Sequence, residues 1–436
     1  MPDELDKILI LASQVDFEER LSKLRSVICE KGTFNPRSEE GEKVAEIIEQ
    51  VRDKGDDAVA DYTMQFDKVE LKPEEFLVSA EDLTEAHERI DKGLLGSIRH
   101  AIENVRKYQA AIFIGKNKDT AAGIRYTPMK RVGICVPGAS AALPSTVIMT
   151  AVPAQVAGVK EIAVVSPPSY NGSIHPVTLA VCCELGIREV YRIGGVQAVA
   201  ALADGTERIK SVNKIVGPGN QWVQSAKRLV YGQVGIDSLA GPSEVLIIAN
   251  EQANAAWVAA DMLSQAEHAP GSAVVFTDSE KFAEKVLEEL KGQVRQLGRA
   301  DETERCLEEY SGIVVFDKIA DAIEWANDFA TEHLQIQCGD ESRAIADQIE
   351  NAGAIFIGDY SPVAVGDYWA GPSHTLPTGG GARFASALTS NDFVKSMSII
   401  EYSREQLSAS AEDIIRLAET EGLGAHANSV RIRQED

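Results

Sequence analysis

The spacing of apolar residues along this chain changes near residue 131. Before that point apolar residues recur every three or four positions, as in the segment VAEIIEQV, which predicts helices within 38–66 and 81–112. Residues 1–31 are acidic and amphipathic, so we expect them to form a helical arm. The first third of the chain is therefore predicted to be mainly helical.

Short β-branched runs alternate with helical segments after residue 131. The first series is VGICVP (132–137), IAVVSPP (162–168), VYRIGG (190–195) and KIVGPG (214–219). The second series is VLIIAN (245–250), AVVFTD (273–278), IVVFD (313–317), LQIQC (334–338) and AIFIGD (354–359). This alternation is typical of βαβ units, which build a parallel sheet with helices on its faces.

The sequence thus predicts an α/β fold with two sheet-forming blocks. They meet near LAGPSEV (239–245), and the tail from 391 to 436 is expected to be mostly helical. Because ligands of open parallel sheets bind beyond the carboxyl ends of the strands, we expect the functional residues in the loops that follow them.

Composition excludes several classes of protein. The chain has 436 residues, 44% hydrophobic and 25% charged, which is ordinary for a globular protein. A net charge of −24 argues against nucleic acid as a partner. The longest apolar stretch (145–165) contains Pro153 and Lys160, so no membrane span is expected. Six scattered cysteines predict neither a disulfide framework nor a four-cysteine zinc site, and we expect a reducing, cytoplasmic location.

Two strand-to-helix junctions are rich in glycine, GGVQAVAAL (194–202) and GPGNQWV (217–223). Each would direct backbone N–H groups and a helix N-terminus at an anion such as a pyrophosphate. Neither has the dinucleotide-binding fingerprint, and tight packing of strand against helix explains the glycines equally well.

Four of the seven histidines lie beyond residue 260 with a carboxylate nearby in the sequence. They occur in LSQAEHAPG (Gln265, His268), ATEHLQI (Glu332, His333), VGDYWAGPSHTLPT (Asp367, His374) and EGLGAHANSV (Glu421, His426). Asp261, Gln265 and His268 share one face of a predicted helix. Imidazoles with oxygen ligands suit Zn²⁺. A structural role is the alternative, since free carbonyl groups stabilise a charged histidine at the end of a helix.

These segments together closely resemble the histidinol dehydrogenase family. The matching strings, in the family's order from about residue 38 to the end, are VPGASAALPSTVIM, GGVQAVAAL, GPGNQWVQSAKR, AGPSEVLIIA, LSQAEH, EHLQIQ, GDYWAGPSHTLPT and EGLGAH. Eight linked strings make chance agreement negligible.

The resemblance implies a role for each candidate residue. It implies one Zn²⁺ per subunit on Gln265, His268, Asp367 and His426, the last from the other subunit of a homodimer. Glu332 and His333 match the family's acid–base pair. The substrate-binding positions are Ser243, Gln265, His268, His333, Asp367, His374, Glu421 and His426, and the NAD⁺-binding positions are Cys135, Gln197 and Asn220.

The family fold implies two incomplete Rossmann-like domains, one inserted in the other, with helical terminal segments that cross the dimer. The implied parts are an N-terminal helical arm (1–31), a first domain with the metal and substrate site (32–131 and 242–389), an inserted NAD⁺ domain (132–241) and a C-terminal helical tail (390–436).

The implied activity is the four-electron oxidation of L-histidinol to L-histidine through histidinaldehyde, the last steps of histidine biosynthesis. A paralogous zinc and NAD⁺ dehydrogenase of another small alcohol, such as a sulfonated diol, is the nearest alternative. Further alternatives are aldehyde oxidation through a thiohemiacetal on Cys135 or the Cys182–Cys183 pair, a zinc hydrolase with Glu332 as base, and a non-catalytic nucleotide-binding module.

The chain departs from the family's pattern at two places. Cys135 and Ala139 stand in CVPGA where many members have YVPGG, which affects the expected NAD⁺ contact. Ser373 stands in GPSH where asparagine is common, which weakens one hydrogen bond near the substrate but retains His374. Neither departure touches the implied zinc ligands.

Overall fold

The structure is a computed structural model that describes residues 4–30, 38–116, 123–138, 142–239, 241–268 and 270–435. The chain divides into two compact units. The larger comprises 1–114 and 128–394, and the smaller comprises 115–127 and 395–436. Among the described helices, none is both long enough and apolar enough to cross a membrane.

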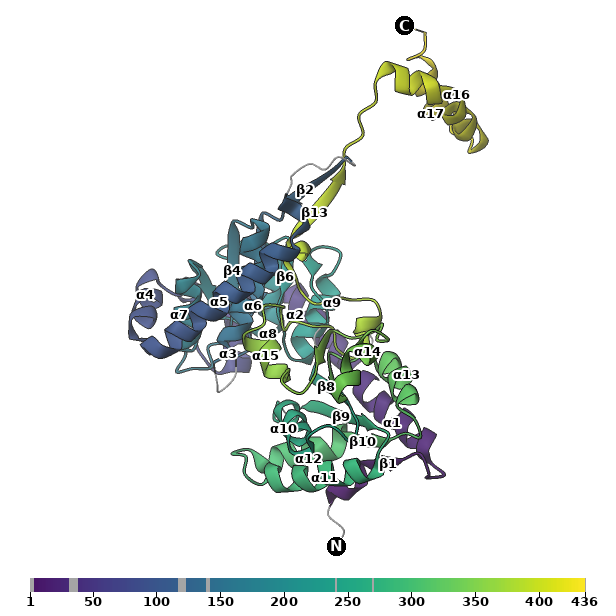
Figure 1. Ribbon diagram of the computed structural model, residues 1–436. Coiled ribbons are helices and arrows are strands. Elements are labelled where there is room, and N and C mark those ends of the chain that lie inside the picture. The colour runs from purple at the N-terminus through teal and green to yellow at the C-terminus, as the bar shows by residue number, and fades with distance from the viewer. Residues whose placement is uncertain are drawn as a thin grey trace. The chain divides into compact units, whose positions relative to one another are not determined.

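The larger unit contains a six-stranded parallel sheet (Figure 1). In spatial order its strands are β1 (Leu9–Leu11), β10 (Gly312–Val315), β9 (Gly271–Thr277), β8 (Ser243–Ala249), β11 (His333–Gln337) and β12 (Ala354–Ile357). Helices cover both faces. One face carries α10 (Ala255–Ala266), α11 (Glu280–Val294) and α12 (Ala300–Tyr310), and the other carries α1 (Phe17–Glu30), α13 (Ile319–Phe329) and α14 (Ser342–Ala346).

A second parallel sheet in the same unit has five strands. They are β5 (Glu189–Tyr191), β4 (Glu161–Val165), β3 (Arg131–Cys135), β6 (Lys214–Val216) and β7 (Gly235–Ile236). One face packs against α2 (Glu39–Lys54), α3 (Asp56–Asp67), α8 (Gly195–Asp204) and α9 (Gln221–Val230). The other packs against α4 (Ala80–Arg89), α5 (Lys92–Ile112), α6 (Pro144–Ala157) and α7 (Pro176–Glu184).

Burial on both faces explains why the strands read as continuous apolar runs. In β3, Val132 and Ile134 contribute to one hydrophobic cluster while Cys135 contributes to the opposite one. Alternate residues of a strand point to opposite faces, so a sheet covered on both sides needs apolar residues at every position. The expected α/β fold with two parallel sheets is confirmed.

Each β-branched run expected after residue 131 forms a strand. The N-terminal arm differs from the prediction, because it contains β1, which pairs with β10, before α1. The helical segment 38–66 is divided at Gly55, whose φ of 57° suits glycine. The segment 81–112 is divided between α4 and α5. The domain boundaries expected from the sequence stay a prediction.

The smaller unit is described by itself. It holds most of a two-stranded sheet of β2 (Ile124–Pro128) and β13 (Val394–Ser398). The last residue of β2 and the first residue of β13 belong to the larger unit. Two helices follow, α16 (Arg404–Thr420) and α17 (Gly424–Arg431), and they pack against each other. The expected helical tail is therefore present, preceded by a strand.

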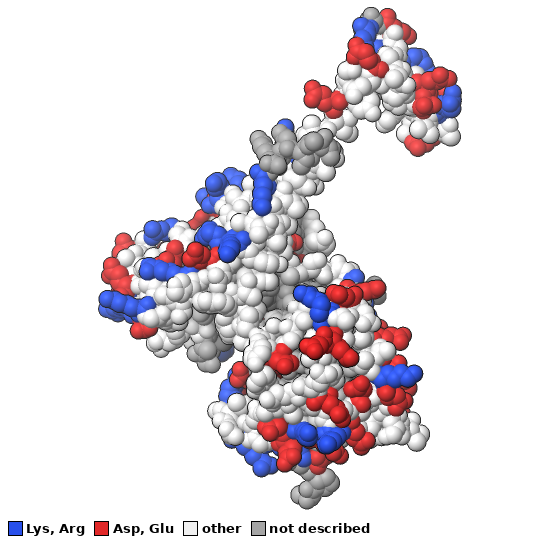
Figure 2. Space-filling view, in the orientation of Figure 1, with Lys and Arg blue, Asp and Glu red and all other residues white. Residues whose placement is uncertain are grey.

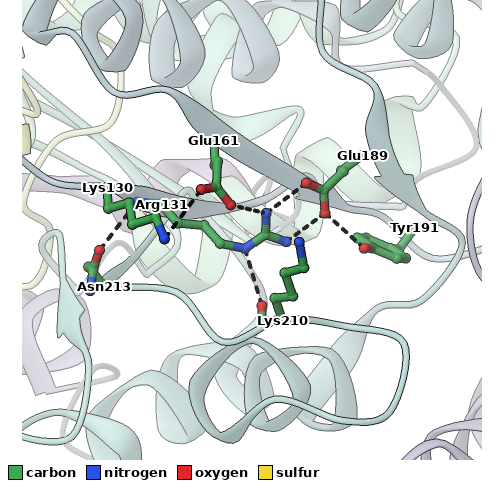
Figure 3. Close-up of polar contacts among 7 residues, drawn as sticks. All are labelled: Lys130, Arg131, Glu161, Glu189, Tyr191, Lys210 and Asn213. Atoms are coloured by element: carbon green, nitrogen blue, oxygen red, sulfur yellow. Dashed lines mark hydrogen bonds and ion pairs between the residues drawn. The ribbon is translucent and has the colours of Figure 1, made fainter.

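An ionic network around the buried Arg131 joins the amino ends of three strands of the five-stranded sheet (Figure 3). Arg131 begins β3, and its guanidinium donates to both carboxylate oxygens of Glu189 at 2.7 and 2.6 Å. It also donates to Glu161 at 3.3 Å and to the backbone oxygen of Lys210 at 3.3 Å. Tyr191 donates to Glu189 at 3.0 Å. The network fixes this edge of the sheet and leaves its carboxyl edge for other contacts.

Candidate active site

The expected acid–base pair lies at the amino end of β11. His333 is the first residue of β11, and Ser243 is the first residue of the neighbouring β8. We expected functional residues at the carboxyl ends of strands, but in the six-stranded sheet the candidates lie at the opposite edge. Helix α10, which runs back after β8, ends at that same amino edge and delivers Gln265 there.

The hydrogen bond of His333 fixes which ring nitrogen can act as a base. Its Nδ1 lies 2.9 Å from the backbone oxygen of Glu244, and a carbonyl oxygen only accepts, so Nδ1 carries the hydrogen. In the neutral ring the lone pair is therefore on Nε2. Nε2 is buried with no hydrogen-bond partner among the described residues, 3.8 Å from Oδ1 of Asp367.

The charge state of His333 follows from its neighbours. Burial is the largest influence and lowers the pKa, but the carboxylates of Glu332 and Asp367 outweigh it and raise the pKa to about 9. Oε2 of Glu332 lies 3.3 Å from Nδ1 of the ring. A cation on Asp367 would cancel part of that negative charge and favour the neutral imidazole.

Glu244 is a buried acidic residue beside the pair that sequence reasoning missed. Its backbone N–H donates to Oε2 of Glu332 at 2.9 Å, and its own Oε1 accepts from the N–H of Gly379 at 2.7 Å. Burial, and then the charge of Glu332, raise the pKa of Glu244 to about 8. The available signal was a glutamate inside the apolar run SEVLIIA.

Of the other expected zinc and substrate residues of the larger unit, Asp367 and His374 interact with His333. Gln265 is buried near the end of α10, and its Oε1 has no hydrogen-bond partner among the described residues. Asp367 belongs to α15 (Val363–Tyr368). Burial raises the pKa of Asp367, while the charges of His333 and His268 oppose that rise. Burial, then His333 and His268, lower the pKa of His374 to about 4.

His268 lies just outside the helix on which it was expected. Helix α10 ends at Ala266, and the backbone N–H of His268 donates to the backbone oxygen of Gln265 at 3.2 Å in the following turn. Its side chain is exposed. Asp261, expected on the same helical face, instead accepts from Gln335 and Gln337 at 3.0 and 2.8 Å.

Glu421 and His426 belong to the smaller unit. Glu421 caps the C-terminus of α16, and His426 lies on α17, where both side chains are exposed. Among the described residues no group of three His, Cys, Asp or Glu side chains could hold a metal ion. The implied ligand set takes only His268 and Asp367 of those types from the larger unit, so this finding leaves it a prediction.

The expected NAD⁺ residues lie at the carboxyl edge of the five-stranded sheet. Cys135 ends β3, Gln197 is in the first turn of α8 after β5, and Asn220 caps α9 after β6. Gln197 is 1% exposed, yet neither atom of its amide has a partner in the described part of the chain. Asn220 accepts from the N–H of Val223 at 3.1 Å and is exposed.

Cys135 and Cys182 do not resemble activated nucleophiles. Burial raises the pKa of the Cys135 and Cys182 thiols to about 12. A thiol needs a lowered pKa or an adjacent base to attack an aldehyde at neutral pH. These environments argue against the thiohemiacetal alternative.

Of the two departures from the family pattern, the one at Ser373 lies wholly within the described residues. Ser373 is buried, donates to the backbone oxygen of Met149 at 3.0 Å and accepts from the N–H of Thr375 at 3.1 Å. It thus ties the loop that carries His374 to α6. Ala139 lies outside the described residues.

The surface reflects the acidic composition. On the face that Figure 2 shows, Asp and Glu side chains are spread over the elements of the six-stranded sheet, with Lys and Arg among them.

Two parallel sheets, a buried glutamate–histidine pair and glycine-rich helix N-termini together define an α/β enzyme built for acid–base catalysis.

Comparisons with known proteins identify the family. The histidinol dehydrogenase family model matches residues 33–434. A histidinol dehydrogenase of Rhodopirellula baltica is 45% identical over 441 residues, covering 97% of this chain and 96% of that protein. One of Bacillus subtilis is 45% identical over 422 residues, covering 95% and 97%. The crystal structure of histidinol dehydrogenase from Elizabethkingia anophelis has a TM-score of 0.89 and 33% identity, over 98% of both chains.

The chain therefore belongs to the histidinol dehydrogenase family. This makes it an oxidoreductase of histidine biosynthesis, as the sequence resemblance implied.

Proposed function

We propose that the protein oxidises L-histidinol to L-histidine through histidinaldehyde, in two successive NAD⁺-linked steps at a zinc site. The observation that carries the proposal is a set of buried polar atoms without partners in the described residues: Oε1 of Gln265, the amide of Gln197 and Nε2 of His333. Leaving a buried polar group unpaired costs about 1–3 kcal/mol. These three positions are the ones assigned to the metal, the cofactor and the transferred proton.

The donor set of the larger unit fits a zinc ion. Gln265, His268 and Asp367 would hold it, together with His426 of the partner subunit, giving two imidazoles and two oxygen ligands. The carboxylate of Asp367 supplies oxygen atoms that can bind the ion. Oε1 of Gln265 supplies another, and no donor among the described residues occupies it. When bound, Zn²⁺ supplies positive charge and a template for the substrate's imidazole and amine.

The carboxyl edge of the five-stranded sheet fits NAD⁺. The unpaired amide of Gln197 would bind the cofactor, with Asn220 at the start of α9 and the end of β3 at Cys135 beside it. The N-termini of α8 and α9 present backbone N–H groups suited to its phosphates. When bound, NAD⁺ accepts the hydride in each step.

The acid–base pair divides the proton transfers. His333 takes the proton of the alcohol at Nε2, the nitrogen left free by the bond of Nδ1 to Glu244. Glu332 takes a proton from the water that adds to the aldehyde. Its Oε2 already accepts from the N–H of Glu244, which leaves Oε1 for that water.

Further residues complete the substrate site. Ser243 at the start of β8, His374 with its lowered pKa, and Glu421 of the smaller unit are proposed to bind the substrate. A neutral His374 can donate and accept hydrogen bonds without repelling a cationic ligand set. Because Glu421 and His426 share a helical unit of their own, we propose a homodimer in which this unit completes the site of the partner.

The proposed arrangement of domains follows the same plan. The five-stranded sheet would form an NAD⁺ domain inserted into a domain built on the six-stranded sheet, and each would be an incomplete Rossmann-like domain. We propose a cytoplasmic location, which the lack of disulfide bonds among the described cysteines and the net charge of −24 support.

A stoichiometric assay tests the proposal. Zinc-loaded protein is supplied with limiting L-histidinol and excess NAD⁺, and NADH and histidine are counted. We expect two NADH per histidine, and loss of turnover after the metal is removed with a chelator that zinc then reverses. One NADH per histidinol with release of the aldehyde, or turnover without NAD⁺, would contradict it.

A further inference from the structure

Glu244 is a buried titratable residue whose carboxyl has no part in the proposed mechanism. It is the second residue of β8 and is 4% exposed. The neighbouring strand β11 brings Glu332 and His333 beside it, with Val245 opposite His333 in the register. A buried acid of this kind needs compensating contacts, because burial disfavours its charged form.

The contacts of Glu244 reach both members of the acid–base pair. Its backbone N–H donates to Oε2 of Glu332 at 2.9 Å, and its backbone oxygen accepts from Nδ1 of His333 at 2.9 Å. Its carboxyl faces the backbone N–H of Glu332 in return. The two glutamates thus each present a carboxyl to the other's main chain, across adjacent strands.

The same carboxyl also holds a loop. Oε1 of Glu244 accepts from the N–H of Gly379 at 2.7 Å, and the hydroxyl of Thr378 accepts from the N–H of Gly241 at 2.6 Å. Gly379 and Gly380 have φ of 59° and 72°, so their backbone follows a course that few other residues adopt. The start of β8 and this loop are therefore tied together at Glu244.

We propose that Glu244 is a positioning residue for the Glu332–His333 pair, which it fixes through its main chain and through its carboxyl on Gly379. The proposal rests on the proposed catalytic roles of Glu332 and His333. Held by three contacts, the pair keeps the free Nε2 of His333 and Oε1 of Glu332 directed at the substrate. Positional errors of about 1 Å can reduce a rate about 100-fold.

The charge balance agrees with this role. Burial and the neighbouring Glu332 raise the pKa of Glu244 to about 8, so its carboxyl holds a proton at neutral pH. A glutamine amide keeps one acceptor oxygen, but its NH2 group only donates. Glutamine should therefore preserve the contact with the N–H of Gly379 and lose the contact with the N–H of Glu332, whereas alanine removes both.

The test compares Glu244→Ala, Glu244→Gln and a control, Glu251→Gln, in the full-length zinc-loaded protein. Glu251 follows the opposite end of β8 and accepts from Ser279 at 2.7 Å. With L-histidinol and with supplied histidinaldehyde, we expect Glu244→Ala to lower kcat about 10- to 100-fold with less than a threefold change in either KM. Glu244→Gln should recover kcat to within about fivefold of wild type, and the control should match wild type.

Coupling to Glu332 separates positioning from a general loss of structure. In a Glu332→Ala background, Glu244→Ala should lower the small residual rate of the aldehyde step less than threefold, because one of the two residues that Glu244 positions is gone. Additive losses would overturn the proposal, as would a raised KM with unchanged kcat. If Glu244→Ala does not fold, Glu244→Gln and Glu244→Asp replace it, and an Asp variant as active as Gln would overturn it. Wild-type kcat in Glu332→Ala alone would instead refute the proposed function.

Discussion

At the scale of single residues, the most informative side chains are polar, buried and unpaired. Gln197 and Gln265 both have unpaired amide atoms, although glutamine seldom stands out in a sequence. The nearness of carboxylates to histidines in the sequence predicted an acid–base or metal site around the histidines. Only the family resemblance assigned these two glutamines to the cofactor and the metal. Glu244 escaped both approaches, because its importance lies in contacts with residues that are distant in the sequence.

Gln197→Leu should weaken NAD⁺ binding without destabilising the protein. Its amide has no partner in the described part of the chain, so an apolar side chain of similar size removes an unpaired group and should keep or raise the free energy of unfolding. The KM for NAD⁺ should rise about tenfold, or about 1.4 kcal/mol, with little change in the KM for histidinol. Steady-state kinetics and urea unfolding measure both.

Gln155→Leu is the matched control for this change. The amide of Gln155 donates to the backbone oxygen of Leu185 at 2.7 Å, so its loss should cost about 1 kcal/mol of stability while the KM for NAD⁺ stays the same. A Gln197→Leu protein that is destabilised but binds NAD⁺ normally would show that the amide has a structural partner instead.

His333→Ala and Glu332→Ala should affect different half-reactions. Loss of Nε2 removes the base for the alcohol proton, so His333→Ala should lower the rate of the first NADH at least 100-fold. Glu332→Ala should spare that step and block oxidation of supplied histidinaldehyde. Pre-steady-state NADH formation from each substrate separates the two, and equal losses in both steps would contradict the division.

At the scale of elements, hydrophobic patterning predicted the strands after residue 131 because they are buried on both faces. It missed β1, whose three residues become a strand only by pairing with β10, some three hundred positions away. The sequence does place Glu332 and His333 directly before the predicted strand LQIQC, which corresponds to the amino edge of a parallel sheet, so the general expectation of the carboxyl edge was wrong for this pair. The pattern could not show that α10 returns Gln265 to the same edge.

The network around Arg131 should stabilise the five-stranded sheet without affecting catalysis. Arg131 is 4% exposed. Its removal breaks the ion pair with Glu189 and leaves Glu161 with Lys130, 3.8 Å away, at the amino edge, opposite the expected cofactor residues. Arg131→Met should lower the free energy of unfolding by roughly 3 kcal/mol. The exposed pair of Arg89 with Glu85 at 2.7 Å provides the control, and Arg89→Met should cost under about 0.5 kcal/mol.

Denaturant unfolding measures both variants, and the KM for NAD⁺ should stay within twofold of wild type in each. A loss for Arg131→Met no larger than that of the control would show that burial of the charges offsets their attraction, since a buried ion pair is costly to desolvate.

At the scale of the whole molecule, the chain passes between its two units at 114–115, 127–128 and 394–395. The proposal assigns Glu421 and His426 of the smaller unit to the site of a second chain. The sequence alone indicated Glu421 and His426 as candidate site residues. Only the resemblance implied that His426 binds the metal of another subunit. The smaller unit exposes apolar side chains such as Ile400 and Leu417, at 84% and 67%, which suits contact with a second chain.

Mixing two inactive variants tests the shared site. His268→Ala and His426→Ala each remove one proposed ligand, so separate homodimers should be inactive. After subunit exchange, half of the chains should be in heterodimers, each with one intact site, and about a quarter of wild-type activity should return. No recovery, with exchange verified by mass spectrometry, would mean that each chain builds its own site.

The opposite edges used by the two sheets have an electrostatic consequence. Helices α10 and α13 end, at Ala266 and Phe329, on the edge that carries Gln265 and His333. Helices α8 and α9 begin on the carboxyl edge of the other sheet. Aligned peptide dipoles make the first edge a negative pole and the second a positive one, each worth about 0.3–1 kcal/mol per nearby charge. The backbone dipoles alone therefore favour a cation at the first edge and phosphate groups at the second, which agrees with the proposed positions of the metal and of NAD⁺.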